Sequence, residues 1–379
     1  MKIVPFLTLL FSVFAIPGFL LAEDLEAHRH SSIRTRIDSI LSEFQNEMKK
    51  EELSNLEALP ETASANESIT YFEVFLEGLE IPFALLSRLK ENSSTNAHYE
   101  VASWANLSFI ARKFTRKHAT MIHTDFQILK DESGESMTIH LELPSGPLLL
   151  GLHKKHPKGR VCIIVDDMGH FGKGFPVYLS MNQPVAFSIL PFYNTSPLQA
   201  KTSYKEGFEI MLHVPMEPSH GNYFKYENII QRELDENVLI SRIRTVFDQV
   251  PLISGWNNHQ GSKATSDKRT MEIVMKELSQ NRPELYFIDS ITSPDTYGYS
   301  IARRLGIPSA KRNFDFLDNR KSKPAIQSKI SQLLNKAKAA HGPIIAILHE
   351  NWISAVSLKE MLPKFQEEEI ELVSPTDFL

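Results

Sequence analysis

Short apolar runs alternate with helix-like stretches throughout the second part of the chain. The runs are rich in β-branched and aromatic residues and lie at 161–165, 185–190, 208–212, 285–288, 344–348 and 370–373. Between them, apolar residues recur with helical spacing at 236–250, 267–278, 296–305, 323–340 and 354–368. Continuous apolar strands that alternate with amphipathic helices are typical of parallel sheets covered by helices. The pattern therefore predicts an α/β domain of about seven or eight strand–helix units, either a barrel or a doubly wound sheet.

The chain before residue 150 has a mixed pattern. It predicts helices at 31–59, 83–89 and 109–118, and strands at 69–76, 121–129 and 137–143. We interpret residues 23–150 as a small α+β domain with a leading helix. The polar and basic segment 151–160 is predicted to be a linker to the larger domain, residues 161–379.

The first 22 residues have the features of an export signal. Lys2 precedes an apolar stretch, 3–14, and Ala22 ends the segment. Leu20 is larger than the small residue preferred at that position before a cleavage site, so the segment is either a cleaved signal peptide or an uncleaved membrane anchor. Both alternatives predict an extracytoplasmic protein, in the periplasm, in the cell envelope or secreted.

Composition narrows the class of protein. The chain has 379 residues, 42% of them hydrophobic, which is enough for about two domains with cores of their own. A formal net charge of −5 argues against a dedicated nucleic-acid binder, because such proteins normally carry a basic excess. Cys162 is the single cysteine, so an intramolecular disulfide is excluded.

Residues that can bind a metal or move a proton follow several predicted strands. They are Asp166 and Asp167 after 161–165, His213 after 208–212, Asp289 after 285–288 and His349 after 344–348. A further polar group, 257–262, contains His259. The carboxyl ends of parallel strands meet at one edge of a sheet or barrel, so we expect these side chains to converge.

Asp167, His213 and His259 would supply three oxygen and nitrogen ligands and leave one coordination position open. Catalytic sites for Zn²⁺ or a similar divalent ion are built in this way. Such a site predicts hydrolysis of an amide or ester. Asp166 would accept the proton of the attacking water, and His349 would protonate the leaving amine.

Other residues are assigned supporting roles. We expect Asp289 and Arg312 to orient His349 or the metal ligands. We interpret Asp318 and Asn319, in contrast, as turn residues.

Glu217 is an alternative third ligand, because it lies four positions after His213. Both side chains would reach one point if the chain turned after the strand, and Pro215 predicts such a turn. Further candidates for a ligand or a substrate contact are Asn258 and Ser262.

A series of short motifs occurs in order along the second domain. It consists of Val165-Asp166-Asp167-Met168-Gly169, Leu190-Pro191, His213-Val214-Pro215-Met216-Glu217-Pro218, Asn257-Asn258-His259-Gln260-Gly261-Ser262, Phe287-Ile288-Asp289-Ser290, Phe316-Leu317-Asp318-Asn319 and Leu348-His349. From about residue 160 to 379 the chain thereby resembles the divergent polysaccharide deacetylase family. This family is distantly related to the NodB-type carbohydrate esterases, which remove acetyl groups from N-acetylated sugars with a divalent metal in a distorted (β/α) barrel.

The resemblance implies a metal-dependent deacetylase acting on an N-acetylated glycan, such as peptidoglycan or an extracellular polysaccharide. It matches Asp166 to the base, Asp167 and His213 to metal ligands and His349 to the acid. The NodB-type pattern has a second His where this chain has Glu217, and we prefer His259 in its place.

The chain also departs from the family pattern. Ile291, Asn313 and Glu350 stand where Arg, Asp and Pro are usual, and these changes affect substrate contacts more than the metal. The alternative function is therefore a catalytically weak or inactive envelope protein that binds carbohydrate or assists cell-wall assembly on the same fold.

Overall fold

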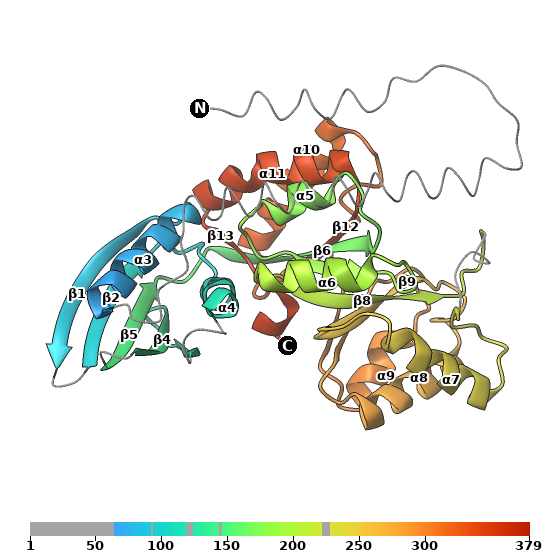
Figure 1. The fold of residues 1–379 in the computed structure, drawn as a ribbon. Coiled ribbons are helices and arrows are strands. Elements are labelled where there is room, and N and C mark those ends of the chain that lie inside the picture. Colours follow the sequence, from blue (N-terminus) through green and yellow to red (C-terminus); the bar gives the residue numbers. More distant parts are fainter. Residues whose placement is uncertain (1–63, 92–93, 119–123, 144–145, 222–227) are drawn as a thin grey trace, which may run out of the picture. The chain divides into compact units, whose positions relative to one another are not determined.

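The computed structural model describes residues 64–91, 94–118, 124–143, 146–221 and 228–379. These residues belong to one compact unit, 59–379, which contains two sheets with separate hydrophobic cores (Figure 1). The predicted export signal and the helix predicted at 31–59 lie outside the described residues. Among the helices that the structure does describe, none has the length and apolar character needed to cross a membrane.

The smaller sheet has the strand order β1-β2-β5-β4-β3. Its strands are β1 Phe83–Glu91, β2 Ser94–Val101, β3 Thr124–Lys130, β4 Glu135–Leu143 and β5 Gly146–Lys154. β2 and β5 pair in parallel, and the other neighbours are antiparallel. Helices α3 (Ala65–Gly78) and α4 (Leu107–His118) contribute the remaining residues of this core.

Two elements of this region are the reverse of the prediction. Residues 69–76, predicted as a strand, lie in α3, which begins with a capping box formed by Ser64 and Glu67. The segment 83–89, predicted as a helix, belongs to β1, an edge strand that pairs with β2 along its length. The sequence was misleading here because β1 lacks the alternation of apolar and polar residues that is typical of a strand. Several of its leucines are exposed, namely Leu85, Leu86 and Leu89.

The connection between the two sheets is shorter than predicted. β5 extends to Lys154 and β6 begins at Gly159, so residues 155–158 join the sheets where the sequence indicated a linker at 151–160. The basic residues of this segment misled the prediction, because Lys154 is a buried strand residue.

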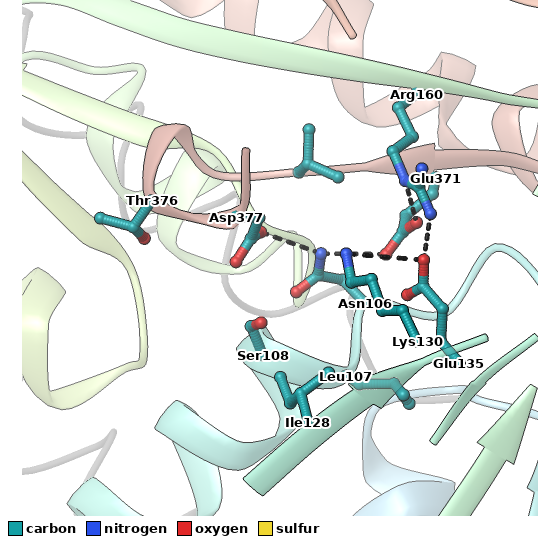
Figure 2. Close-up of a pocket in the computed structure, with 11 residues that line it drawn as sticks. Asn106, Leu107, Ser108, Ile128, Lys130, Glu135, Arg160, Glu371, Thr376 and Asp377 are labelled. Carbon is teal, nitrogen blue, oxygen red and sulfur yellow. Dashed lines mark hydrogen bonds and ion pairs between the residues drawn. The ribbon is translucent and has the colours of Figure 1, made fainter. Parts of the chain in front are cut away.

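A buried ionic cluster joins the smaller sheet to the larger one. Lys154 Nζ lies 2.8 Å from Glu371 and 3.5 Å from Glu135, and Arg160 contacts both carboxylates. Figure 2 shows Glu135, Arg160 and Glu371 of this cluster on the wall of a cavity of about 300 Å³. Asn106 donates to Glu371 over 3.1 Å. The cavity lies at the amino-terminal end of β6.

The larger sheet is parallel throughout, with the order β11-β10-β9-β8-β7-β6-β12 and with β13 also paired to β6. Its strands are β6 Gly159–Met168, β7 Ala186–Ile189, β8 Glu209–Met216, β9 Gly255–Gln260, β10 Tyr286–Asp289, β11 Ser309–Lys311, β12 Ile344–His349 and β13 Ile370–Leu372. Every strand predicted for this domain is present. They are buried on both faces, which explains their continuous apolar runs.

Helices cover the outside of this sheet. They are α5 Phe175–Leu179, α6 Ser196–Lys205, α7 Glu236–Phe247, α8 Lys268–Asn281, α9 Gly298–Arg304, α10 Lys323–Lys338 and α11 Trp352–Glu367, and a 3₁₀ turn, Pro375–Asp377, follows β13. In Figure 1, α5, α10 and α11 lie together on one side, and α7, α8 and α9 form a second group.

The sheet curves until its two edges nearly meet. After β11, Asn313 N donates to Ile345 O over 3.2 Å and Leu317 N donates to Ile347 O over 2.9 Å, so the segment 313–317 lies along β12. This confirms the distorted (β/α) barrel and rules out the doubly wound alternative.

Candidate active site

The predicted site residues lie at the carboxyl ends of β6, β8, β9 and β12. These strands are neighbours in the barrel, except that β7 separates β6 from β8. β7 ends at Ile189, opposite Leu212 of β8, so side chains from the longer β6 and β8 can meet beyond its end. The expected convergence at one rim is therefore present.

Asp166 and Asp167 face the same site because β6 is irregular there. The strand continues to Met168, and its pairing with β7 shifts register between Val165 and Met168. Asp167 has φ of 63°, the left-handed conformation that Asp tolerates better than most residues. A β-bulge inside the strand, and not a turn after it, thus redirects the second carboxylate.

The ligand atoms of Asp167, His213 and His259 form a small triangle. Asp167 Oδ1 lies 2.9 Å from His259 Nδ1 and 3.4 Å from His213 Nε2, and the two imidazole nitrogens are 3.1 Å apart. Atoms about 2.1 Å from one ion, at angles of about 90–110°, are themselves about 3.0–3.4 Å apart. The three residues therefore fit a divalent metal ion.

Electrostatics support the same interpretation. Burial opposes ionisation of Asp167, but the hydrogen bonds and charges of His213 and His259 outweigh it and hold the pKa of Asp167 well below its usual value. Burial also disfavours a charged His213, yet Asp166 and Asp167 raise the pKa of its imidazole. This concentration of negative charge around two imidazoles attracts a cation, and a metal competes with protons for it.

Asn257 connects the proposed base to a proposed ligand. Its Nδ2 donates to Asp166 Oδ1 over 2.8 Å, and its Oδ1 accepts from Ser188 Oγ over 2.5 Å. The same oxygen lies 2.7 Å from His213 Nδ1, which must then carry the proton and leave the Nε2 lone pair directed at the triangle. Burial raises the pKa of Asp166, as suits a residue that accepts a proton.

His349 lies beside Asp166, its partner in the pairing of β12 with β6. Its Nδ1 is 2.9 Å from Asp318 Oδ1, while Asp318 Oδ2 accepts from His349 N over 2.9 Å and from Ser354 Oγ over 2.7 Å. Burial favours the neutral imidazole, but Asp318 outweighs it and raises the pKa of His349 to about 9. His349 is therefore protonated at neutral pH and can donate a proton.

The imidazole of His349 is also held by stacking. The ring of Phe316 lies against it, with centroids 5.4 Å apart and an interplanar angle of 28°. The guanidinium of Arg312 covers the Phe316 ring at 4.1 Å and donates to the carbonyls of Ser290 and Ile291. The predicted orienting role of Arg312 thus agrees with the geometry, acting through Phe316.

Asp289 has a different role from the predicted one. Its carboxylate accepts from Ile291 N over 2.9 Å, from Thr296 Oγ1 over 2.9 Å and from Tyr299 N over 3.0 Å, and so it fixes the start of α9. The prediction that Asp289 orients His349 is wrong. The interpretation of Asp318 as a turn residue is confirmed, but its side chain also contacts His349, which was not predicted.

Glu217 lies apart from the triangle. Its Oε1 is 2.6 Å from Lys263 Nζ and its Oε2 accepts from Arg232 N over 2.9 Å. The turn expected at Pro215 is absent from this described part of the chain, since β8 continues to Met216. Pro215 is tolerated in the strand because β7 has already ended on that side.

The remaining candidates hold loops together. Asn258 Oδ1 accepts from Ser290 N over 3.0 Å, and its Nδ2 donates to Gln260 O over 2.8 Å. Ser262 Oγ accepts from Ser219 N over 2.8 Å. These hydrogen bonds give both residues a structural role, and the predicted ligand or substrate contact stays a prediction.

The roles of Asn257 and Phe316 at the site and the contact of Asp318 with His349 were not predicted. A signal for Asn257 was present, since it lies two positions before His259 on the same strand face. For Phe316 and Asp318 the signal was their place in the motif Phe316-Leu317-Asp318-Asn319, which does not show that this loop reaches His349.

One solved structure shares the fold. The uncharacterised protein ATU2773 from Agrobacterium tumefaciens C58 has a TM-score of 0.53 and 20% identity, and the match covers 58% of this chain and 88% of that one.

Two bacterial proteins are similar in sequence. YibQ of Escherichia coli (strain K12), itself uncharacterised, is 29% identical over 214 residues, which is 56% of this chain and 66% of YibQ. An uncharacterised protein of Haemophilus influenzae (strain ATCC 51907 / DSM 11121 / KW20 / Rd) is 26% identical over 192 residues, 51% of this chain and 67% of its own length. The chain thus spans about two thirds of each relative.

The family model for divergent polysaccharide deacetylases matches residues 163–379. The match includes β7 to β13 and most of β6, and with them every residue of the triangle, the base and the acid. The chain therefore belongs to the divergent polysaccharide deacetylase family.

Proposed function

We propose that the protein is a metal-dependent deacetylase that hydrolyses the acetamide of an N-acetylated glycan outside the cytoplasm. The observation that carries this proposal is the triangle of Asp167, His213 and His259 with Asp166 and His349 beside it. Two imidazole nitrogens and one carboxylate oxygen suit Zn²⁺, although other divalent ions accept the same donors.

The residues divide the reaction between them. A divalent ion bound by the triangle would polarise the acetyl carbonyl and acidify a water molecule. Asp166, whose pKa is raised by burial, accepts the proton of the attacking water. His349, protonated at neutral pH, delivers a proton to the nitrogen of the departing amine, and Asp318 stabilises the charged imidazole before this transfer.

The test combines metal analysis with acetate release from purified full-length protein. We expect about one Zn²⁺ or similar ion per chain, as in other mononuclear sites with three protein ligands, and acetate release from peptidoglycan or N-acetylated chitin oligosaccharides. Asp166→Asn should keep the metal and lose about 10²- to 10⁴-fold in turnover. His213→Ala should lose the metal.

The matched control is Asp315→Asn, because Asp315 is an exposed carboxylate that pairs with Lys329 over 2.7 Å. It should leave both measurements unchanged. Glycan binding without acetate release, equal in wild type and Asp166→Asn, would instead support the envelope binding or assembly protein. Absence of bound metal would refute the enzyme.

A further inference from the structure

Two partly exposed rings lie on the loops that follow β6, which carries Asp167, and its neighbour β7. His170 follows β6 and Tyr193 follows β7; the His170 side chain is 48% exposed, Tyr193 is 38% exposed, and their ring centroids are 5.6 Å apart. His170 is only three residues after Asp167. We call His170 and Tyr193 the ring pair.

The loops that carry the ring pair are fixed to one another. Leu190 N donates to Met168 O over 2.8 Å, Thr195 Oγ1 donates to Gly169 O, and Gln199 Nε2 donates to His170 O over 3.3 Å. The position that a Cβ would take at Gly169 is 3.3 Å from Tyr193 Cδ2, so the tyrosine ring lies directly against this glycine. A surface held in this way loses little conformational entropy when a ligand binds.

Glu350 orients the histidine of the ring pair. Its Oε2 lies 3.5 Å from His170 Nε2, and its Oε1 accepts from Gly174 N over 2.9 Å and from Phe175 N over 3.0 Å. The Glu350 side chain is 3% exposed. A buried carboxylate thus anchors the loop after β6, at a position where the sequence analysis noted a departure from the family pattern.

We infer that the ring pair is a stacking platform for a sugar ring adjacent to the one that loses its acetyl group. The inference rests on the proposed function and adds a substrate class, an N-acetylated glycan of at least two sugars. Sugar rings present faces of C–H groups that pack on aromatic rings, while their hydroxyls stay in solvent, so exposed and rigid rings suit them. Glu350, which contacts His170, comes directly after His349, and its N–H donates to Asp166 O over 2.8 Å. This connection between the ring pair and the proposed acid and base would place the stacked sugar next to the reacting one.

The test compares chain lengths of one substrate. Binding and acetate release are measured for N-acetylglucosamine and for tetra-N-acetylchitotetraose, with wild type, Tyr193→Ala and Tyr193→Phe. We expect Tyr193→Ala to weaken binding of the tetrasaccharide and to raise its KM by about tenfold with kcat nearly unchanged. Tyr193→Phe, which keeps the ring, should behave as wild type, and the monosaccharide should show no difference between variants.

The matched control is Phe126→Ala, because Phe126 is 39% exposed on β3 of the smaller sheet. It should bind both sugars as wild type does. Zn²⁺ binding should be equal in all variants, which shows that the triangle is intact.

The outcomes separate the two proposals. Tetrasaccharide binding that depends on Tyr193 but yields no acetate supports the platform and refutes the deacetylase. Acetate release from both sugars that is equal in wild type and Tyr193→Ala refutes the platform and leaves the deacetylase standing. A wild-type protein that prefers the tetrasaccharide no more than the monosaccharide also refutes the platform.

Discussion

The strength of His349 as an acid depends on a single carboxylate. Asp318 is buried, contacts both the ring and the backbone of His349, and is the main reason that the pKa of this histidine rises from 6.5 to about 9. The proposed acid therefore stays protonated at neutral pH and up to about pH 9. In many hydrolases, the environments of two titratable groups differ in this way, so that one group acts as the acid and the other as the base.

Replacing Asp318 with Asn should shift the pH dependence of catalysis. The reaction needs protonated His349, so wild-type kcat/KM should fall as the pH rises through about 9. In Asp318→Asn the pKa of His349 returns toward 6.5, and kcat/KM at about pH 8 should drop roughly tenfold. The check is the pH profile of kcat/KM, and an alkaline limb that stays in place would contradict this role of Asp318.

Single residues also show how much of the site can be predicted from the sequence. Asp166, Asp167, His213 and His349 could be found because each follows or lies in a recognisable apolar strand, and His259 because it lies in the polar group 257–262. Asp289 and Asp318 look equivalent in the sequence, and the choice between them depends on loop paths that local pattern does not encode.

At the scale of elements, the buried ionic cluster fastens β5 of the smaller sheet to β6 and β13 of the barrel. The Lys154 ammonium is fully buried between Glu135 and Glu371, and Arg160 completes the charge balance. Burial and the nearby charge of Glu135 raise the pKa of Glu371, whereas Lys154 and Arg160 act to lower it, so the charge of this carboxylate in the fold depends on Lys154 and Arg160.

Lys154→Met should therefore destabilise the protein by about 3–5 kcal/mol, because two buried carboxylates lose a common partner. The matched control is Lys323→Met, which removes an exposed pair with Glu360 and should cost less than about 1 kcal/mol. Urea unfolding followed by circular dichroism measures both. Equal midpoints for the two variants would show that the cluster adds nothing to stability.

Elements were predicted well in the barrel and less well in the smaller sheet, where α4, β3 and β4 are confirmed but α3 and β1 were predicted wrongly. Barrel strands are buried on both faces and separated by helices with clear periodicity, so burial and pattern agree. In the smaller sheet, α3 depends on a capping box and β1 depends on pairing with β2, and neither was weighed in the prediction. The barrel itself followed from the family resemblance, since the residues alone left a doubly wound sheet open.

At the scale of the whole molecule, metal binding should raise the free energy of unfolding. The ligands come from β6, β8 and β9, which are far apart in the sequence, so an ion that binds them favours the folded state. At about 100 times its dissociation constant, such an ion adds about 2.7 kcal/mol.

Thermal unfolding should therefore occur at a higher temperature with Zn²⁺ than with a chelator. His213→Ala should abolish the difference, whereas His140→Ala, which removes an exposed histidine of β4, should retain it. Melting curves that do not respond to Zn²⁺ would argue against the metal site irrespective of the reaction.

The near-closure of the barrel links its architecture to its chemistry. Phe316 and Asp318 lie on or beside the segment that runs along β12 in place of one more regular strand, whereas the metal ligands lie on β6, β8 and β9. If the contacts between this segment and β12 are lost, proton donation by His349 can therefore fail while the metal ion stays bound. A protein that lost these contacts would still bind its metal and its sugar. Without proton donation it would act only as a carbohydrate-binding protein.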